Sequence, residues 1–173
     1  MLVPSRISDN RGFFSESYSR RRYAETEIGA DFVQDNHSKS SQGVRRGLHY
    51  QLPPHAQGKL TRVIQGEVLD ISVDIRESSP TCGQYVAEIL SSENKKQLYI
   101  PEGFAHGFLT LSKTSEFLYK TTNFYHPESE RCILWNDATL NIKWPENLKI
   151  ELSPKDLLGQ SFKSSELFYV NNR

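Results

Sequence analysis

Two histidines and a lysine carry the side chains that proton transfer beside a ketone requires. His49 lies in the run 47–50 (GLHY), Lys59 follows ten residues later, and His106 lies in the run 101–108 (PEGFAHGF). Inverting a carbon centre next to a ketone needs a base on one face, an acid on the other, and a cation or donor at the oxygen where enolate charge develops. An unperturbed imidazole has a pKa of about 6.5, so His49 can act as the base near neutral pH. The sequence predicts these groups on successive strands of one β-barrel.

The composition fits a single globular domain spanning residues 1–173. The chain is 36% hydrophobic and carries 21 acidic and 21 basic side chains, so its formal net charge is zero. This balance argues against nucleic acid or an anionic membrane as a partner, because both normally attract a strongly basic surface. Cys82 and Cys132 form no CxxC or metal-like spacing, and the chain shows neither a signal peptide nor a long apolar run. We therefore expect a cytoplasmic protein with free thiols.

Short β-rich runs separated by turn residues predict an all-β sandwich or barrel. Residues 63–76 alternate apolar and polar side chains after Gly66, which we interpret as a hairpin turn. Similar runs occupy residues 85–90, 97–100, 107–111 and 116–121. Two short peripheral helices are expected, one over residues 19–27 and one after Ser153 and Pro154, which suit a helix start.

Several motifs occur in order through most of the chain, from about Arg11 to Asp156. They are the runs 32–38 (FVQDNHS), 46–51 (RGLHYQ), 56–60 (AQGKL), 91–95 (SSENK), 100–108 (IPEGFAHGF), 118–120 (LYK) and 135–137 (WND). Together they closely resemble the dTDP-4-dehydrorhamnose 3,5-epimerase family. The resemblance implies a double-stranded β-helix, the cupin-type jelly roll, that is usually a homodimer and acts on a dTDP-sugar nucleotide without a cofactor.

The resemblance also assigns catalytic roles. It makes His49 the proton acceptor, Asp156 the carboxylate that orients it, and Tyr119 the proton donor on the opposite face of the sugar. Lys59, which we expect to lie across a hairpin from His49, would stabilise the enolate. From sequence alone, Asp156 is equally an acid in the first turn of a helix, and the residues around Tyr119 favour a core aromatic with a bonded hydroxyl.

Substrate binding is assigned in the same way. A nucleoside diphosphate needs cations for its phosphates and aromatic rings for its base. Positions that contact substrate in the family are matched by Gln34, Asp35, Asn36, Arg46, His106, Glu130 and Lys155. Arg11 and Glu16 match a segment that reaches into the partner's site, and Phe13 and Tyr125 are candidate stacking rings for thymine. His37, His55 and His126 receive no role.

A catalytic metal is not expected. The run that contains His106 has the form of the second cupin motif, which supplies one imidazole ligand in metal cupins. The other ligands would need an HxH pair, and His49 and His55 are six residues apart, so they cannot supply such a pair on one strand face. The chain therefore lacks the metal ligands that a metal-dependent cupin oxygenase needs. A non-catalytic sugar-binding cupin would not need a base, an acid and an oxyanion group together. A 3-only epimerase shares the same groups and stays an alternative, with a 3,4-ketoisomerase as a more distant one.

Two departures from the family pattern bear on specificity. Arg45 stands where the family usually has an aliphatic residue, which predicts either an exposed strand face or an added positive charge near the site. The segment before Arg11 is shorter than in many members. We expect this difference to change the sheet edge or the exchange between protomers.

Overall fold

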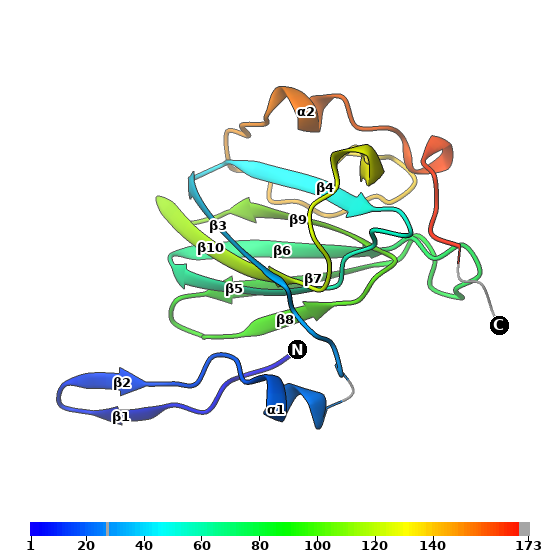
Figure 1. Ribbon diagram of the computed structural model, residues 1–173. Helices are drawn as coiled ribbons and strands as arrows, with labels where there is room; N and C mark the ends of the chain where they lie inside the picture. Colours follow the sequence, from blue (N-terminus) through cyan, green and yellow to red (C-terminus); the bar gives the residue numbers. More distant parts are fainter. Residues whose placement is uncertain (27, 170–173) are drawn as a thin grey trace.

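Two antiparallel sheets pack face to face in the computed structural model, which describes residues 1–26 and 28–169 (Figure 1). The four-stranded sheet has the order β3-β10-β5-β8, with β3 (Gln34–Ser41), β5 (Lys59–Gln65), β8 (Gln97–Ile100) and β10 (Thr114–Thr121). The five-stranded sheet has the order β11-β4-β9-β6-β7, with β4 (Arg45–Gln51), β6 (Glu67–Asp74), β7 (Tyr85–Ser91), β9 (Phe104–Thr110) and β11 (Glu130–Cys132). The predicted jelly roll is confirmed.

The two faces of the five-stranded sheet pack against different cores. Between the sheets, Val63 and Phe117 of the four-stranded sheet meet Val68 and Phe108 of the other. On the outer face, a second cluster contains Leu48, Tyr50, Ile71, Val73, Ile75, Ala105, Ile133 and Leu140. Burial on both faces explains why β6 is almost continuously buried, although its sequence alternates. One end of the space between the sheets remains lined by polar side chains, and this end holds the candidate site.

The predicted hairpin at Gly66 is wrong. Strands β5 and β6 belong to different sheets, and β5 pairs with β8 and β10 whereas β6 pairs with β7 and β9. Gly66 instead turns the corner between the sheets with a φ of 75°, and a Cβ there would lie 2.1 Å from the Thr114 carbonyl oxygen. The hairpin expected between His49 and Lys59 is wrong for the same reason. Strands β4 and β5 face each other from opposite sheets.

The N-terminal segment forms a hairpin that projects from the barrel. Its strands are β1 (Ile7–Asp9) and β2 (Gly12–Phe14), and a short helix α1 (Arg20–Ala24) leads back to β3 (Figure 1). The side chains of Ile7 and Phe14 are 73% and 71% exposed, so the hairpin carries apolar surface away from the body of the protein. Helix α1 is shorter than the predicted 19–27, and residue 27 lies outside the described residues.

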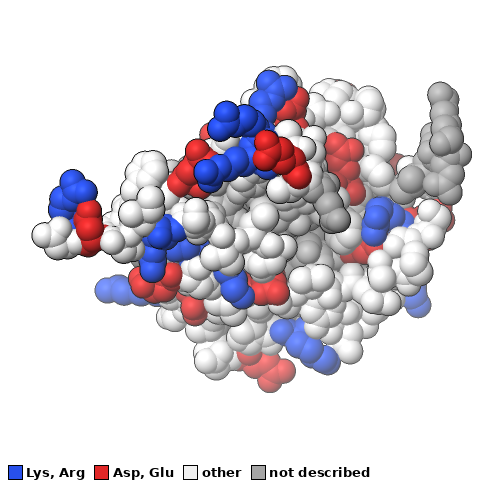
Figure 2. Space-filling model, turned by 90° about the horizontal axis from the view of Figure 1, so that it is seen from below, with Lys and Arg blue, Asp and Glu red and all other residues white. Residues whose placement is uncertain are grey.

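The helix expected after Ser153 is confirmed as α2 (Pro154–Leu157). The Ser153 side chain accepts a hydrogen bond from the Asp156 backbone N–H, and Pro154 occupies the first turn. Two 3-10 turns, η1 (Pro127–Ser129) and η2 (Phe162–Ser164), complete the described elements. Figure 2 shows acidic and basic side chains interspersed on the face it presents. Among the described residues, no helix is long and apolar enough to cross a membrane.

Candidate active site

A polar cavity of about 270 Å³ opens between the two sheets. Its walls come from β3, β4, β5, β9 and β10, and α2 closes one side. The residues predicted from sequence that line this cavity are Arg46, His49, Lys59, His106, Tyr119, Lys155 and Asp156. The structure therefore brings all four predicted catalytic side chains to one place, from segments that are far apart in the chain.

His49 and Asp156 form a dyad on the five-stranded wall. Nε2 of His49 lies 2.7 Å from Oδ1 of Asp156, although the ring N–H points off the line that joins the two atoms. The Asp156 side chain is 4% exposed. Its burial disfavours the charged carboxylate, but the contacts with His49, Ser153 and Gly47 outweigh this and lower the pKa of Asp156 to about 2. Asp156 is therefore charged at neutral pH, and the second ring nitrogen of His49 is left for a substrate.

Gly47 and Ser153 hold Asp156 in place. The Gly47 backbone N–H donates to Oδ1 at 3.2 Å, and the Ser153 hydroxyl donates to Oδ2 at 2.7 Å. A side chain at position 47 would not fit, because a Cβ there would lie 2.5 Å from the His106 carbonyl oxygen on β9. The glycine of the run 47–50 thus permits both the close approach of two strands and the hydrogen bond to the dyad.

Lys59 reaches the cavity from the four-stranded sheet. Lys59 is 8% exposed, and its Nζ donates a hydrogen bond to the His49 carbonyl oxygen at 3.3 Å. Burial disfavours the ammonium and lowers the pKa of Lys59 to about 8, although Asp70 and Glu130 oppose this shift. Lys59 is thus a cation next to the base, and it is charged at neutral pH.

His106 is held behind the dyad by a buried carboxylate. Nε2 of His106 lies 3.0 Å from Oδ1 of Asp70, and Oδ2 of Asp70 accepts a hydrogen bond from Thr61. Burial lowers the pKa of His106 below its ordinary value even though Asp70 opposes the shift. His106 is therefore a neutral hydrogen-bonding group at the inner end of the cavity.

Tyr119 faces the cavity from β10, on the sheet opposite His49. Burial raises the pKa of its phenol, and the Glu130 charge adds to this, so the hydroxyl keeps its proton at neutral pH. Within the described residues, this hydroxyl has no hydrogen-bond partner. A protonated, unpaired hydroxyl that faces a cavity is suited to donate a proton to a ligand.

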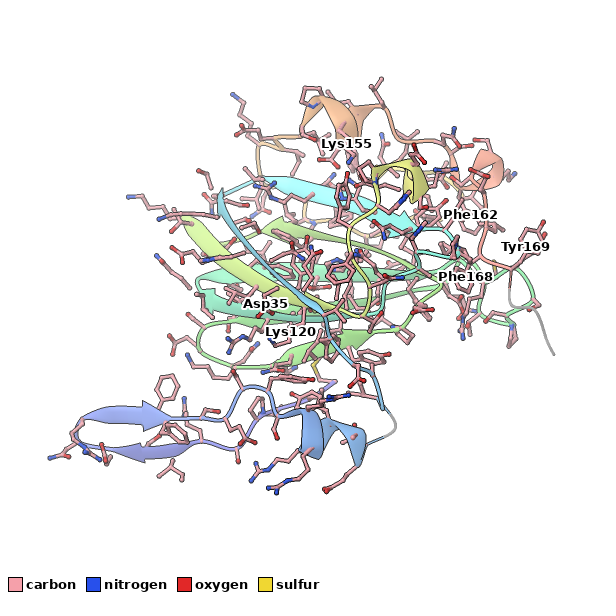
Figure 3. The ribbon with its side chains drawn as sticks, in the orientation of Figure 1. Asp35, Lys120, Lys155, Phe162, Phe168 and Tyr169 are labelled. Atoms are coloured by element: carbon pink, nitrogen blue, oxygen red, sulfur yellow. The ribbon has the colours of Figure 1, made fainter. Side chains whose placement is uncertain are left out.

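A charged cluster lies around Lys155 at the edge of the cavity, which we call the rim; Glu130 and Tyr125 belong to this cluster but do not line the cavity. The Glu130 carboxylate accepts hydrogen bonds from Lys155 and, at 2.6 Å, from the Tyr125 hydroxyl. Burial opposes ionisation of Glu130, but these two donors lower its pKa. Arg46 lies nearby on β4 and donates to the Ser40 hydroxyl at 3.1 Å. Lys155 extends from the first turn of α2, as Figure 3 shows.

The other predicted binding residues do not line this cavity. Asn36 pairs with Tyr119 across β3 and β10, and the Gln34 side chain accepts a hydrogen bond from the Tyr125 backbone N–H. Asp35 is 72% exposed and pairs with Lys120 at 2.8 Å (Figure 3). Arg11, Phe13 and Glu16 belong to the N-terminal segment: Arg11 bonds Asp9, Phe13 lies over a groove near β5, and Glu16 pairs with Arg22.

Sequence reasoning missed the residues that hold the catalytic groups. Ser153 holds Asp156, and Asp70 holds His106. Sequence reasoning also missed Ser38, which holds no catalytic group but whose buried hydroxyl lines the cavity and has no hydrogen-bond partner among the described residues. Only the helix-cap position of Ser153 gave a signal, and it was interpreted as structural. The three remaining histidines lie elsewhere: His37 pairs with Glu116 at the surface, and His55 stacks on His126 at 3.7 Å.

The expectation for Arg45 is wrong. Arg45 is 2% exposed, and its side chain lies on the outer face of β4, away from the cavity. The guanidinium carbon is 3.8 Å from the ring centroid of Trp135 and 4.2 Å from that of Trp144. Because the indole rings cover the cation from both sides, Arg45 neither exposes the strand nor adds charge to the site.

A jelly roll with a His–Asp dyad, a buried lysine and an opposing tyrosine around one cavity defines an enzyme of proton transfer beside a carbonyl. The sequence model of the dTDP-4-dehydrorhamnose 3,5-epimerase family matches residues 1–164. The chain belongs to this family.

Individual relatives agree with this assignment. The dTDP-4-dehydrorhamnose 3,5-epimerase of Shigella flexneri is 56% identical over 97% of this chain and 93% of its own length. The crystal structure of a Legionella pneumophila 3,5-epimerase in complex with dTDP-4-keto-L-rhamnose matches with a TM-score of 0.93 and 49% identity, covering 97% of this chain and 91% of that one. A 3′-monoepimerase of Streptomyces bikiniensis, in complex with dTDP-quinovose, has a TM-score of 0.91 but 28% identity, covering 97% and 87%.

Proposed function

We propose that this protein epimerises dTDP-4-dehydro-6-deoxy-D-glucose at C3 and C5 and forms dTDP-4-dehydro-L-rhamnose. The observation that carries the proposal is the placement of the His49–Asp156 dyad and the Tyr119 hydroxyl on opposite walls of one cavity, with Lys59 beside them. The family assignment and the sequence identity to 3,5-epimerases support the choice of substrate.

His49 acts as the base in the first step. It removes the proton from the carbon next to the C4 ketone, and the electron pair of the broken C–H bond moves to the ketone oxygen as an enolate. The Asp156 charge, 2.7 Å away, stabilises the imidazolium that forms. Lys59 carries the positive charge that offsets the enolate.

Tyr119 completes the inversion from the other face. Its phenol donates a proton to the same carbon, the carbonyl re-forms, and the configuration is inverted. Water then returns a proton to the phenolate. The same sequence at the second carbon needs the imidazolium to lose its proton first, and the open cavity gives solvent access, since 28% of the His49 side chain is exposed.

The nucleotide part of the substrate lies at the rim in this proposal. Arg46 and Lys155 supply positive charge for the diphosphate, and Tyr125 supplies an aromatic face for thymine. His106 and the free Ser38 hydroxyl supply polar contacts deeper in the cavity. Gln34, Asp35, Asn36 and Glu130 lie along the strands that border this rim.

We also propose a homodimer in which Arg11, Phe13 and Glu16 of one protomer reach the cavity of the other. The projecting hairpin supports this, because it holds these residues away from the cavity of their own protomer and exposes apolar side chains (Figure 1). A cytoplasmic location belongs to the same proposal and is supported by the two free cysteines.

Incubation with dTDP-4-dehydro-6-deoxy-D-glucose in D₂O tests the reaction. Because each inversion replaces a substrate proton with a solvent deuteron, we expect deuterium at both C3 and C5 and an L-rhamno product by NMR. Deuterium and inversion at C3 alone would instead identify a 3-only epimerase, which the likeness to the monoepimerase keeps as the second candidate. Incorporation at neither carbon would refute both.

A further inference from the structure

Cys132 is a thiol that the proposed reaction does not use, and it lies beside the base. Strand β11 pairs with β4 so that Cys132 stands directly opposite His49. The Cys132 sulfur, one ring nitrogen of His49 and one carboxylate oxygen of Asp156 all lie within 4.8 Å of one another. Among the described residues, the sulfur makes a single weak hydrogen bond, 3.7 Å long, to the Ile133 carbonyl oxygen.

We propose that Cys132, His49 and Asp156 form an inhibitory binding site for Zn²⁺ or a similar thiophilic divalent cation. Thiolate, imidazole and carboxylate are the three ligand types that zinc prefers in proteins. A tetrahedral zinc ion that binds its ligands at about 2.0–2.3 Å holds them about 3.5 Å apart, so side-chain rotations of roughly 1 Å complete the site. The cavity next to His49 leaves room for water as the fourth ligand.

The backbone that carries the three ligands is already fixed. Leu48 and Ile133, which adjoin His49 and Cys132, exchange backbone hydrogen bonds of 2.9 and 3.2 Å across β4 and the end of β11. Asp156 is held by Gly47 and Ser153. A metal that binds here therefore needs little ordering of the chain, which favours affinity.

Binding exchanges a proton for the metal. Burial raises the pKa of the Cys132 thiol to about 12, so the free protein carries S–H at neutral pH. Zinc forms a bond to sulfur, the S–H bond breaks, and the proton leaves to solvent, with no change of oxidation state. The negative charge of Asp156, which is itself a ligand, offsets part of the positive charge of the metal.

Inhibition follows from the identity of the ligands and rests on the proposed function. A zinc ion here binds one ring nitrogen of His49 and an oxygen of Asp156. The imidazole then loses either the nitrogen that takes the substrate proton or the carboxylate that stabilises the imidazolium, so the dyad can no longer act as the base. Mg²⁺ and Ca²⁺ prefer six or more oxygen ligands and should neither bind here nor inhibit.

Titration calorimetry of the untagged protein, stripped with EDTA and desalted, tests the binding directly. We expect one Zn²⁺ per chain, and Cys132→Ser should weaken the affinity at least ~10-fold, since even outer-shell changes have effects of that size. Cys82→Ser is the matched control, because Cys82 lies in the turn before β7, outside the cavity lining, and should leave the affinity unchanged. A 1:1 Co²⁺ complex should show thiolate-to-metal charge-transfer absorption in the parent and in Cys82→Ser but not in Cys132→Ser.

Activity measurements complete the test. Zn²⁺ should lower the turnover of the parent and of Cys82→Ser, EDTA should restore it, and Cys132→Ser should keep its turnover at the same Zn²⁺ concentration. If Cys132→Ser does not fold, Cys132→Ala serves in the same measurements. Stoichiometric binding that survives the loss of Cys132, or no stoichiometric binding by the parent, would overturn the site. The calorimetric result does not depend on turnover, so a protein that binds zinc but has no epimerase activity would refute only the proposed function.

Discussion

The two walls of the cavity hold their reactive side chains in different ways. On the five-stranded side, His49 meets Asp156, and Asp156 is itself held by Ser153 and Gly47. On the four-stranded side, the Tyr119 hydroxyl has no hydrogen-bond partner within the described residues. The base is therefore oriented before substrate arrives, whereas the acid obtains its last orientation from the substrate. Preorganisation is concentrated where the first bond breaks.

Burial on the four-stranded wall shifts the pKa values of its two titrating groups in opposite directions. It raises the pKa of Tyr119, which preserves a proton donor, and it lowers the pKa of Lys59 to about 8, which brings the ammonium close to losing its charge. In each case the low-polarity surroundings favour the neutral form. The acid is thus insensitive to pH near neutrality, and the oxyanion-stabilising cation is not.

The largest effect should come from removing the base. His49→Ala should lower turnover by ~10² to 10⁴-fold, the range of a positioned general base. Substrate binding, measured by calorimetry, should change little, because Arg46 and Lys155 at the rim remain. Near-normal turnover in a folded His49→Ala protein would mean that the preorganised wall does not supply the base.

Tyr119→Phe should separate the two walls. The phenyl ring keeps the packing and removes only the hydroxyl, so His49 should still abstract protons while delivery from the far face fails. In D₂O we expect deuterium to enter retained substrate faster than epimer forms, whereas His49→Ala should do neither. Equal loss of exchange and inversion, or loss of neither, would make Tyr119 a structural aromatic.

Asp156→Asn should lower turnover less than His49→Ala or Tyr119→Phe. It leaves the imidazole in place and removes the charge that stabilises its protonated form. A hydrogen bond to a charged group contributes about 1.5–3 kcal/mol, so turnover should fall ~10- to ~100-fold at a tenfold loss per 1.4 kcal/mol. Circular dichroism would confirm the fold. A drop as large as that of His49→Ala would show that the two residues act as one unit.

The smallest effect is expected from pH. The protonated Lys59 is the active form, so its contribution to turnover should be complete below its pKa of about 8 and should decline as pH rises through that value. Lys59→Arg keeps the charge at all accessible pH values and should move this decline upward, at some cost in turnover from altered geometry. A decline at the same pH in Lys59→Arg would assign it to another group.

The local strand pattern could be predicted from the sequence, whereas the pairing of strands could not. Alternation located β6 and β10, but both expected hairpins were wrong because a jelly roll pairs strands that are distant in the chain. The segment 63–76 shows why. Its two halves enter different sheets, and a glycine that turns a corner has the same sequence signal as one that closes a hairpin.

A site residue could be predicted from the sequence when the chemistry of its side chain has few common structural uses. His49 and Lys59 stand out by chemistry alone, whereas Asp156 and Tyr119 needed the family resemblance, since carboxylates and phenols have many structural uses. Ser38, Ser153 and Asp70 gave no functional signal, because their importance depends on which distant groups they meet. Arg45 was misjudged because its partners, Trp135 and Trp144, lie in a segment that the sequence does not place next to β4.

Because Arg45 stacks on two indole rings, tryptophan fluorescence can report on the outer face of β4. Trp135 and Trp144 are the two tryptophans of the chain, and both cover the same guanidinium on the strand whose other face carries His49. Their fluorescence therefore reports one local environment, not an average over the molecule. A shift in emission that precedes global unfolding would show the catalytic strand loosening while the rest of the barrel is still intact.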